Sequence, residues 1–181
     1  MLEQLAQFDQ ALSHTVADLR WEPLSAVFVV ASMWWVKGAA ICAVGACGDL
    51  RARRLLPRAA VAAATAGGIA AAATALVKEV FDRARPPIAD PEFLALVSTP
   101  QSASFPSGHA STAFAAATAV ALLHPRLRWP ALAIALLVAA SRVYLGVHFT
   151  LDVTAGALFG AAIGAAMVWL VRRTEPLLAR A

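Results

Sequence analysis

The sequence predicts an all-α fold, a polytopic membrane bundle of five or six transmembrane helices preceded by an amphipathic interfacial helix. Of its 181 residues, 60% are hydrophobic and only 14% are charged, against about 25% charged residues in an ordinary soluble domain. The apolar residues are grouped in stretches of about 20, the length at which a helix crosses a bilayer. This composition excludes a disordered chain and disfavours a soluble globular protein. The length fits one domain, residues 1–181.

Residues 1–22 predict a helix that lies along the membrane surface. Apolar residues recur there at three- and four-residue spacing: Leu2, Leu5, Phe8, Leu12, Val16 and Leu19. Polar residues between them make the segment too hydrophilic to span the bilayer, and an amphipathic helix of this kind binds at the interface. It lacks the basic start of a secretory signal peptide, so we expect it in the mature protein.

Five apolar stretches follow as candidate spans: residues 24–47, 59–81, 108–125, 129–148 and 151–171. The first contains Lys37, so it is either one span or a bent pair that breaks near Gly38, and the role of Lys37 stays open. In the last stretch Gly156, Gly160 and Gly164 recur every four residues. Small residues at this spacing let helices approach closely. We therefore expect a packing seam, with an oligomer contact as the alternative and the oligomeric state undetermined.

The distribution of arginines predicts the orientation. Most of them fall in the loops after the first and third stretches and at the C-terminus: Arg51, Arg53, Arg54, Arg58, Arg126, Arg128, Arg172, Arg173 and Arg180. Loops rich in basic residues stay in the cytoplasm. The C-terminus is therefore expected in the cytoplasm, and the N-terminus and the 82–106 connection on the outer side of the cell (inner) membrane.

Charged and polar residues also gather at the outer ends of the stretches: Lys78, Arg85, Ser107, Gly108, His109, Arg142, His148 and Asp152. A charge at the bilayer centre costs about 2.5–3.5 kcal/mol on insertion scales, so we expect these residues at the mouth of a water-filled cleft. Three cations and two histidines in one place indicate an anion. The helix that begins at Gly108 offers free backbone amides suited to a phosphate.

The same residues can carry out phosphoryl transfer, which needs charge stabilisation on the equatorial oxygens. The groups expected to bind phosphate are Lys78, Arg85, Ser107, Gly108 and Arg142. His148 has Asp152 one helical turn away to fix its tautomer, so it is the candidate nucleophile. His109 is then the candidate general acid. The sequence offers no carboxylate cluster for two metals, so we expect neither a metal nor a cofactor.

Three motifs resemble those of the type 2 phosphatidic acid phosphatase family. They are Lys78-x6-Arg85-Pro86, Pro106-Ser107-Gly108-His109 and Ser141-Arg142-x5-His148-x3-Asp152. They occur in the family's order, over residues 78–152, without a departure at any motif position. The resemblance implies a membrane helix bundle, a phosphohistidine intermediate on His148, Asp152 as its orienting partner and His109 as the acid. It also implies a set of residues that bind phosphate: Lys78, Arg85, Ser107, Gly108 and Arg142.

Taken singly, these residues have structural alternatives. Lys78 or Arg85 could anchor the chain at the interface, Ser107 could be a helix cap, and Arg142 could form a salt bridge with Asp152. We expect the residues that flank the first motif to be solvated or supporting rather than catalytic: Glu79, Asp82 and Arg83. We expect His14 and His124 to be surface residues. The joint arrangement favours a site over these separate explanations.

A polar site at the outer mouth of a bundle suits a substrate whose tail stays in the membrane lipid. We therefore expect a hydrolase acting on a lipid phosphate or diphosphate, with undecaprenyl diphosphate favoured by family analogy. Phosphatidic acid, phosphatidylglycerol phosphate and other prenyl phosphates are alternatives. Two further classes are an anion transporter, which normally binds at the midplane, and a noncatalytic lipid-binding protein. Nothing indicates nucleic-acid binding.

Overall fold

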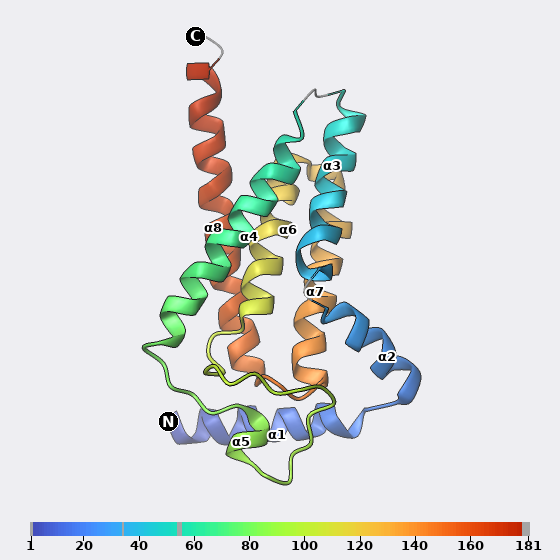
Figure 1. The fold of residues 1–181 in the computed structure, drawn as a ribbon, viewed down its shortest axis with the longest axis vertical. Helices are drawn as coiled ribbons and strands as arrows, with labels where there is room; N and C mark the ends of the chain where they lie inside the picture. The colour runs from blue at the N-terminus through green and yellow to red at the C-terminus, as the bar shows by residue number, and fades with distance from the viewer. Residues whose placement is uncertain (1, 34, 54–55, 179–181) are drawn as a thin grey trace.

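The computed structural model describes residues 2–33, 35–53 and 56–178, and these form helices and loops without a strand. The predicted all-α fold is confirmed. The long helices run side by side, while the N-terminal helix lies across one end of the bundle (Figure 1). Arg54 and Arg180, counted above among the basic residues, lie outside the described residues.

The helices in chain order are α1 (Leu2–Asp18), α2 (Glu22–Ala31), the π-helical η1 (Val36–Ala40), α3 (Ile41–Arg51), α4 (Arg58–Lys78), α5 (Pro86–Ala89), α6 (Gly108–Leu123), the 3-10 turn η2 (Pro125–Leu127), α7 (Arg128–Tyr144) and α8 (Thr150–Leu178). Within the described residues, three helical segments are long and apolar enough to cross a membrane: Arg58–Lys78, Pro125–Tyr144 and Thr150–Thr174. At 16 residues, α6 is shorter. It reaches about 24 Å at 1.5 Å per residue.

The first candidate span is bent. The helical segments Glu22–Ala31 and Val36–Arg51 meet at 72°, which corresponds to the bent-pair alternative for residues 24–47. The sequence suggests a break near Gly38, but in the structure the break lies earlier, between Ala31 and Val36. The π-helical turn η1 follows the break directly and packs against α4, α6 and α7.

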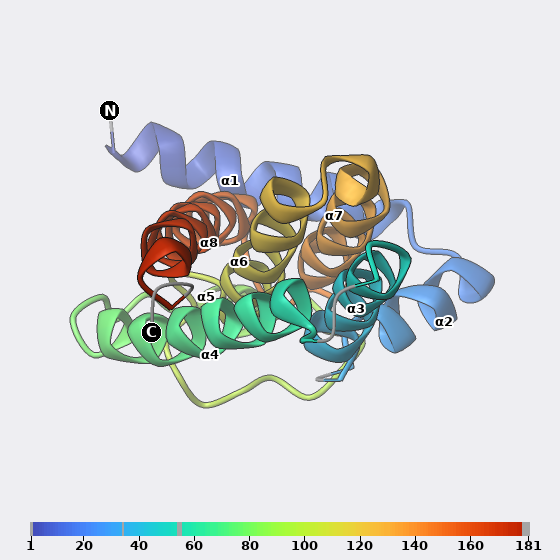
Figure 2. The ribbon, with the colours of Figure 1, turned by 90° about the horizontal axis from the view of Figure 1, so that it is seen from above.

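Helix α6 lies at the centre, with α4, α7 and α8 packed around it (Figure 2). The interfaces are built from small side chains, among them the fully buried Ala66, Ala113, Ala117 and Ala135. Because such residues let helix axes approach, the short α6 is enclosed on several sides. Large side chains such as Leu76 and Leu158 point outward and are exposed, as expected of a surface that faces lipid.

The glycine series of α8 packs against α6. A Cβ added at Gly160 would overlap the carbonyl oxygen of Ser111, and one at Gly164 would overlap that of Ala115. At Gly156 the added atom would lie 2.5 Å from the carbonyl oxygen of Ser107. The seam therefore lies within one chain, between the two helices that begin at the candidate site.

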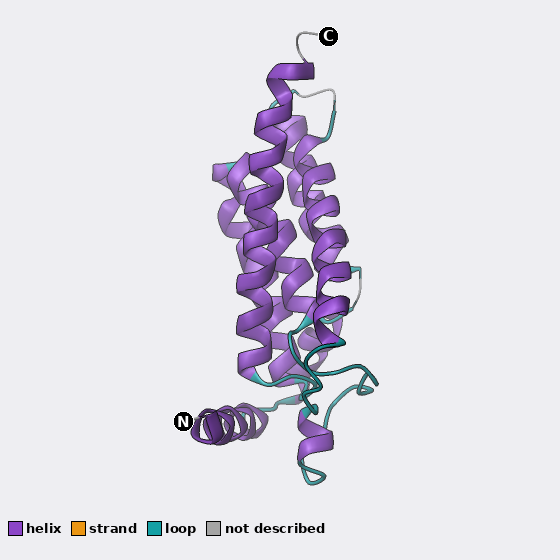
Figure 3. Ribbon diagram, turned by 90° about the vertical axis from the view of Figure 1, so that its left-hand side faces the viewer, coloured by secondary structure: helices purple, strands orange, loops and turns teal. Residues whose placement is uncertain are grey.

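Helix α1 lies across the end of the bundle instead of running along it (Figure 3). It turns its polar side inward, where Asp9 and Ser13 are buried, and leaves Leu5, Phe8 and Leu19 exposed. This arrangement suits an interfacial helix, because the apolar face is free to enter the boundary between head groups and acyl chains.

The arginine-rich loops lie at the end of the bundle opposite α1 and α5 (Figure 1). At that end His124 is not the surface residue that the sequence suggests. Its side chain is 14% exposed, and Nε2 lies 2.9 Å from Oδ1 of Asp49. The other oxygen of Asp49 accepts the backbone N–H of Ala59 at 2.8 Å, so this pair closes the start of α4. His14 is exposed and bonds to Asp90 at 3.0 Å.

We predict that Gly160→Ala destabilises the protein by about 1–3 kcal/mol, because the methyl group would force α6 and α8 apart. Thermal or denaturant unfolding in detergent measures the effect. Gly68→Ala is the matched control, since a Cβ at Gly68 has no atom within 4 Å. Alanine there should be neutral or stabilise by up to about 1 kcal/mol, because it favours a helix. Equal stabilities of the two variants would contradict the seam.

Candidate active site

The three motif segments meet around the carboxylate of Asp152, which is fully buried at the start of α8. Its oxygens accept hydrogen bonds from Nη1 of Arg83 at 2.5 Å, from Oγ of Ser104 at 2.5 Å and from the backbone N–H of Phe149 at 3.0 Å. A buried charge needs such partners, and the positive end of a helix also favours it. Asp152 is therefore held in one position.

His148 is oriented between this carboxylate and a guanidinium group. Its Nδ1 lies 3.4 Å from Oγ of Ser104 and 3.7 Å from Oδ2 of Asp152. Its Nε2 lies 3.1 Å from Nη1 of Arg85. Because a guanidinium can only donate, Nε2 is the acceptor and Nδ1 carries the proton. In this tautomer the lone pair of Nε2 accepts the hydrogen bond from Arg85, and both side chains line the cavity described below.

The environment of His148 keeps its ring neutral. Burial lowers its pKa to about 4, the hydrogen bond with Asp152 acts in the opposite direction, and the charge of Arg85 lowers the pKa further. Burial also lowers the pKa of Arg85, but a guanidinium stays protonated at neutral pH. A neutral imidazole beside a fixed cation is therefore the state expected near pH 7.

Backbone carbonyls, not carboxylates, hold two of the cations. Arg85 donates to the oxygens of Ser102 at 2.9 Å and Val147 at 2.8 Å. Lys78 donates through Nζ to the oxygens of Ala103 and Ser104. Both side chains are thereby positioned while their charge is not neutralised, which favours binding of an anion.

A cavity of about 260 Å³ connects these groups. It is lined by Lys37, Ala71, Thr74, Ala75, Lys78, Arg85, Pro100, Ser102, Gly108, His109, Thr112, Arg142 and His148. The hydroxyls of Thr74 and Thr112 and Nε of Arg142 are buried without a hydrogen-bond partner among the described residues. Buried donors without partners are costly. An anion rich in acceptor oxygens would satisfy them.

The start of α6 fixes the loop before it against α8 and brings Ser107 and Gly108 to the site. The backbone N–H of Ser107 donates to the carbonyl of Asp152 at 2.9 Å, which fixes the loop against α8. The hydroxyl of Ser107 does not cap its own helix and is buried without a partner in the described part of the chain. The helix-cap alternative therefore fails for this side chain, and the neighbouring Gly108 lines the cavity.

His109 lines the same cavity, with Nε2 3.1 Å from the carbonyl oxygen of Ser32. A carbonyl can only accept, so Nε2 carries the proton in this arrangement. Proton donation toward the cavity would then need Nδ1 of the doubly protonated ring. The eight residues predicted from the sequence are thus brought to one end of the bundle, seven of them at the cavity or around it and Asp152 behind His148.

Three further residues support the site, and of these the sequence indicated only Arg83, as solvated or supporting. Ser104 lies between His148 and Asp152, and Arg83 joins Asp152 to Asp9 of α1, with its Nη2 2.8 Å from Oδ2 of Asp9. The salt bridge considered for Arg142 is formed by Arg83 instead. The position of Ser104, three residues before Ser107, was the available signal, whereas nothing in the spacing links Asp9 to α8. No group of three potential metal ligands occurs among the described His, Cys, Asp and Glu residues.

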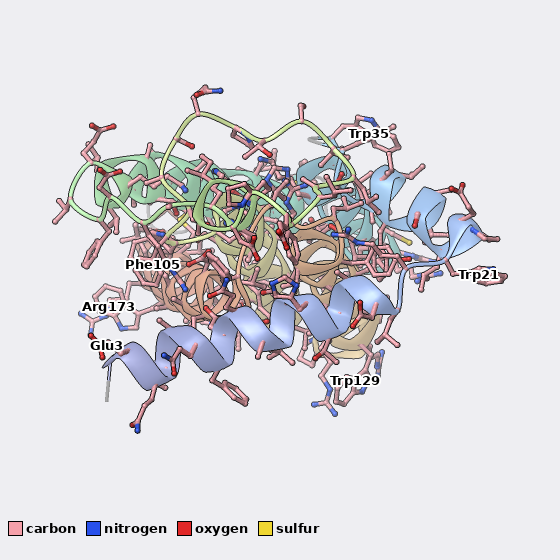
Figure 4. The ribbon with its side chains drawn as sticks, turned by 90° about the horizontal axis from the view of Figure 1, so that it is seen from below. Glu3, Trp21, Trp35, Phe105, Trp129 and Arg173 are labelled. Atoms are coloured by element: carbon pink, nitrogen blue, oxygen red, sulfur yellow. The ribbon has the colours of Figure 1, made fainter. Side chains whose placement is uncertain are left out.

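Figure 4 looks onto this end of the bundle, with α1 crossing on one side and the connection after α4 on the other. Phe105 and Trp35 mark opposite sides of the cluster. Phe105 packs edge-to-face on Phe81 with ring centroids 5.3 Å apart.

Comparison with known proteins identifies the family. A sequence model described as the PAP2 superfamily matches residues 59–176. Over 99 residues the chain is 39% identical to the decaprenylphosphoryl-5-phosphoribose phosphatase of Mycobacterium tuberculosis, which covers 54% of this chain and 52% of that protein. Over 72 residues it is 44% identical to the undecaprenyl-diphosphatase of Sulfolobus acidocaldarius, and this match covers 39% of this chain and 34% of that protein. The chain thus matches about half or less of the length of these relatives.

A solved structure shares the fold. The transmembrane PAP2 type phosphatidylglycerolphosphate phosphatase from Bacillus subtilis superposes with a TM-score of 0.74 at 24% sequence identity, over 95% of this chain and 88% of that one. At this identity the likeness concerns the arrangement of the helices. The superposition covers a larger share of the chain than residues 59–176, which the family model matches.

We predict that His148 stays neutral down to about pH 4 in the free protein, whereas free histidine titrates near about 6.5. Nitrogen-15 NMR of histidine-labelled protein in detergent measures this, with His148→Gln assigning the signal. Between about pH 4 and about pH 6.5 the unfolded chain binds more protons at His148 than the folded protein does. The neutral, buried ring therefore contributes its full share of the free energy of unfolding above about pH 6.5, and this share is lost as the pH falls toward about 4. A midpoint near 6.5 would contradict the proposed environment.

Proposed function

The chain belongs to the PAP2 superfamily, and on this premise we propose that it is an integral-membrane phosphatase that hydrolyses the phosphate or diphosphate head group of a lipid through a phosphohistidine on His148. One observation carries the proposal. His148 lines a cavity together with three motif cations and directs Nε2 toward one of them, Arg85, while Nδ1 faces Ser104 and Asp152. A neutral, oriented imidazole beside an anion site is what nucleophilic attack on phosphorus needs.

The first step transfers the phosphoryl group to the imidazole. The substrate phosphate binds among Lys78, Arg85 and Arg142, and Arg85 turns its donor from Nε2 to a phosphate oxygen. Nε2 then attacks in line, the nitrogen–phosphorus bond forms, and the bond from phosphorus to the leaving oxygen breaks. The cations stabilise the charge on the equatorial oxygens, and Asp152 stabilises the positive charge that the ring acquires.

The second step returns the enzyme. In the first step His109 gives the proton on its Nδ1 to the leaving oxygen, and in the second step the same nitrogen takes a proton from the attacking water, as microscopic reversibility requires. The water oxygen bonds to phosphorus, the nitrogen–phosphorus bond breaks, and inorganic phosphate leaves. The residues present supply every group used, so we propose that the reaction needs no metal.

The proposed substrate is a polyprenyl phosphate or diphosphate, with undecaprenyl diphosphate favoured. Two relatives are named for decaprenyl- and undecaprenyl-linked phosphates. The cavity is lined by the end of α4 and the start of α6, at the end of the bundle that α1 crosses (Figure 1). Since α1 exposes apolar side chains there, this position suits a polar head group on a tail held in lipid. Phosphatidic acid and phosphatidylglycerol phosphate remain alternatives that the assay below includes.

The proposed location is the cell membrane, with the site on the outer side. The arginine-rich loops lie at the opposite end of the bundle, and such loops stay in the cytoplasm. The end of α8 lies with them, so the C-terminal end of the chain would be cytoplasmic.

We predict that the purified protein releases inorganic phosphate from a panel of lipid phosphates, and that His148→Ala lowers kcat by about 10³-fold or more. Vanadate should inhibit and a chelator should not. His14→Ala is the control, since His14 is exposed on α1. Activity that survives His148→Ala would rule out the assigned nucleophile. Failure to cleave any lipid phosphate would favour a transporter or a noncatalytic lipid-binding protein.

We predict that Ser104→Ala lowers kcat by about tenfold to a hundredfold with little change in KM, because the hydroxyl bonded to Asp152 also orients the ring of His148. Ser104→Thr, which keeps a hydroxyl, should restore part of the rate. Ser98→Ala, an exposed serine of the same connection, is the control. A change confined to KM would show that Ser104 acts on substrate binding instead.

A further inference from the structure

Lys37 is a fourth cation on the cavity and belongs to none of the three motifs. It lies in η1, directly after the break in the first apolar segment. Its side chain is half-buried and forms no hydrogen bond or ion pair with a described residue. A charge in such a segment costs about 2.5–3.5 kcal/mol at the bilayer centre, so its position calls for an anionic partner.

The cavity holds more positive charge than one phosphate neutralises. Carbonyl oxygens position Lys78 and Arg85 beside His148, so these cations are set for the phosphoryl group that His148 attacks. Arg142 and Lys37 are not held in this way. A phosphate monoester carries at most two negative charges, and four cations line the same cavity. The surplus favours a head group with more than one phosphate.

The position of Lys37 indicates which part of the substrate it meets. The turn η1 packs against α6 and α7, and His109 of α6 bonds to Ser32, which caps α2 at the same break. Under the proposed function His109 protonates the leaving oxygen. The wall of the cavity that carries Lys37 is therefore the wall on the leaving-group side.

We propose that Lys37 forms a subsite for the second phosphate of a lipid diphosphate, the phosphate that stays on the lipid. This inference rests on the proposed function and names its substrate class. Nε2 of His148 bonds to the terminal phosphorus, the bridging oxygen takes the electron pair of the broken bond, and a lipid monophosphate leaves. Lys37 neutralises the charge that builds up on that leaving phosphate, where charge stabilisation lowers the barrier. Water then releases inorganic phosphate from His148 as before.

The test compares two substrates with one tail, farnesyl diphosphate and farnesyl monophosphate. Lys37→Gln should lower kcat/KM for the diphosphate by about 10- to 100-fold, the usual effect of losing a charge-assisted hydrogen bond, and leave the monophosphate within about threefold. Lys37→Arg keeps the charge and should keep most diphosphate activity. Arg126→Gln, at the far end of the bundle, should change neither substrate.

A second measurement does not depend on turnover of the diphosphate. With farnesyl monophosphate as substrate, inorganic pyrophosphate should inhibit the wild type more strongly than inorganic phosphate, and Lys37→Gln should remove that difference. An equal loss on both substrates, or unchanged pyrophosphate inhibition, overturns the subsite and leaves Lys37 as an interface anchor. A wild type active on the monophosphate alone overturns the subsite and spares the proposed function. A wild type inactive on both, and on the lipid panel, overturns the proposed function itself.

Discussion

The buried carboxylate of Asp152 is the constraint on which this end of the molecule depends. It collects a guanidinium from the connection after α4, a hydroxyl from the loop before α6 and a backbone N–H from its own turn. The backbone carbonyl oxygen of Asp152 accepts the backbone N–H of Ser107. Leaving a buried charge with a partner removed costs about 3–5 kcal/mol. The segments that carry the motifs are therefore locked to one another, and His148 is oriented as a consequence of that lock.

The same network reaches the membrane surface. Arg83 donates to Asp152 and Asp9, and Asp9 accepts the N–H of Leu151 at 3.0 Å. One cation thus joins the interfacial helix α1 to the carboxylate behind His148. Since the polar side of α1 is used for this contact, its apolar side is left for lipid. The helix is docked to the bundle by charge on one face, and its exposed apolar face is the one expected to enter the membrane interface.

The sequence predicts the parts of this arrangement that depend on spacing. Apolar length predicts the helices, and the three motifs predict a cluster because the helix ends they occupy share one side of the membrane. It does not predict contacts between distant segments, so Arg83 was read as a flanking residue and Asp9 as part of a polar face. Lys37 indicates a possible break in the first apolar stretch, but hydropathy continues across the residues after Ala31, so the sequence does not predict where the bend lies. His124 was misread for the same reason, because its partner Asp49 lies on another helix.

The negative and positive charges of the site lie on opposite sides of His148. Asp152 and Asp9 lie behind His148, whereas the cations lie on the cavity in front of it. A carboxylate partner for Lys78 or Arg85 would have cancelled the charge that an anion needs, but carbonyl dipoles position these side chains and leave it intact. The buried hydroxyls of Thr74 and Thr112 and Nε of Arg142 carry an unmet cost in the free protein. An oxyanion bound there would remove that cost and supply the missing negative charge at once, which is the physical reason to expect phosphate, as proposed, in front of His148.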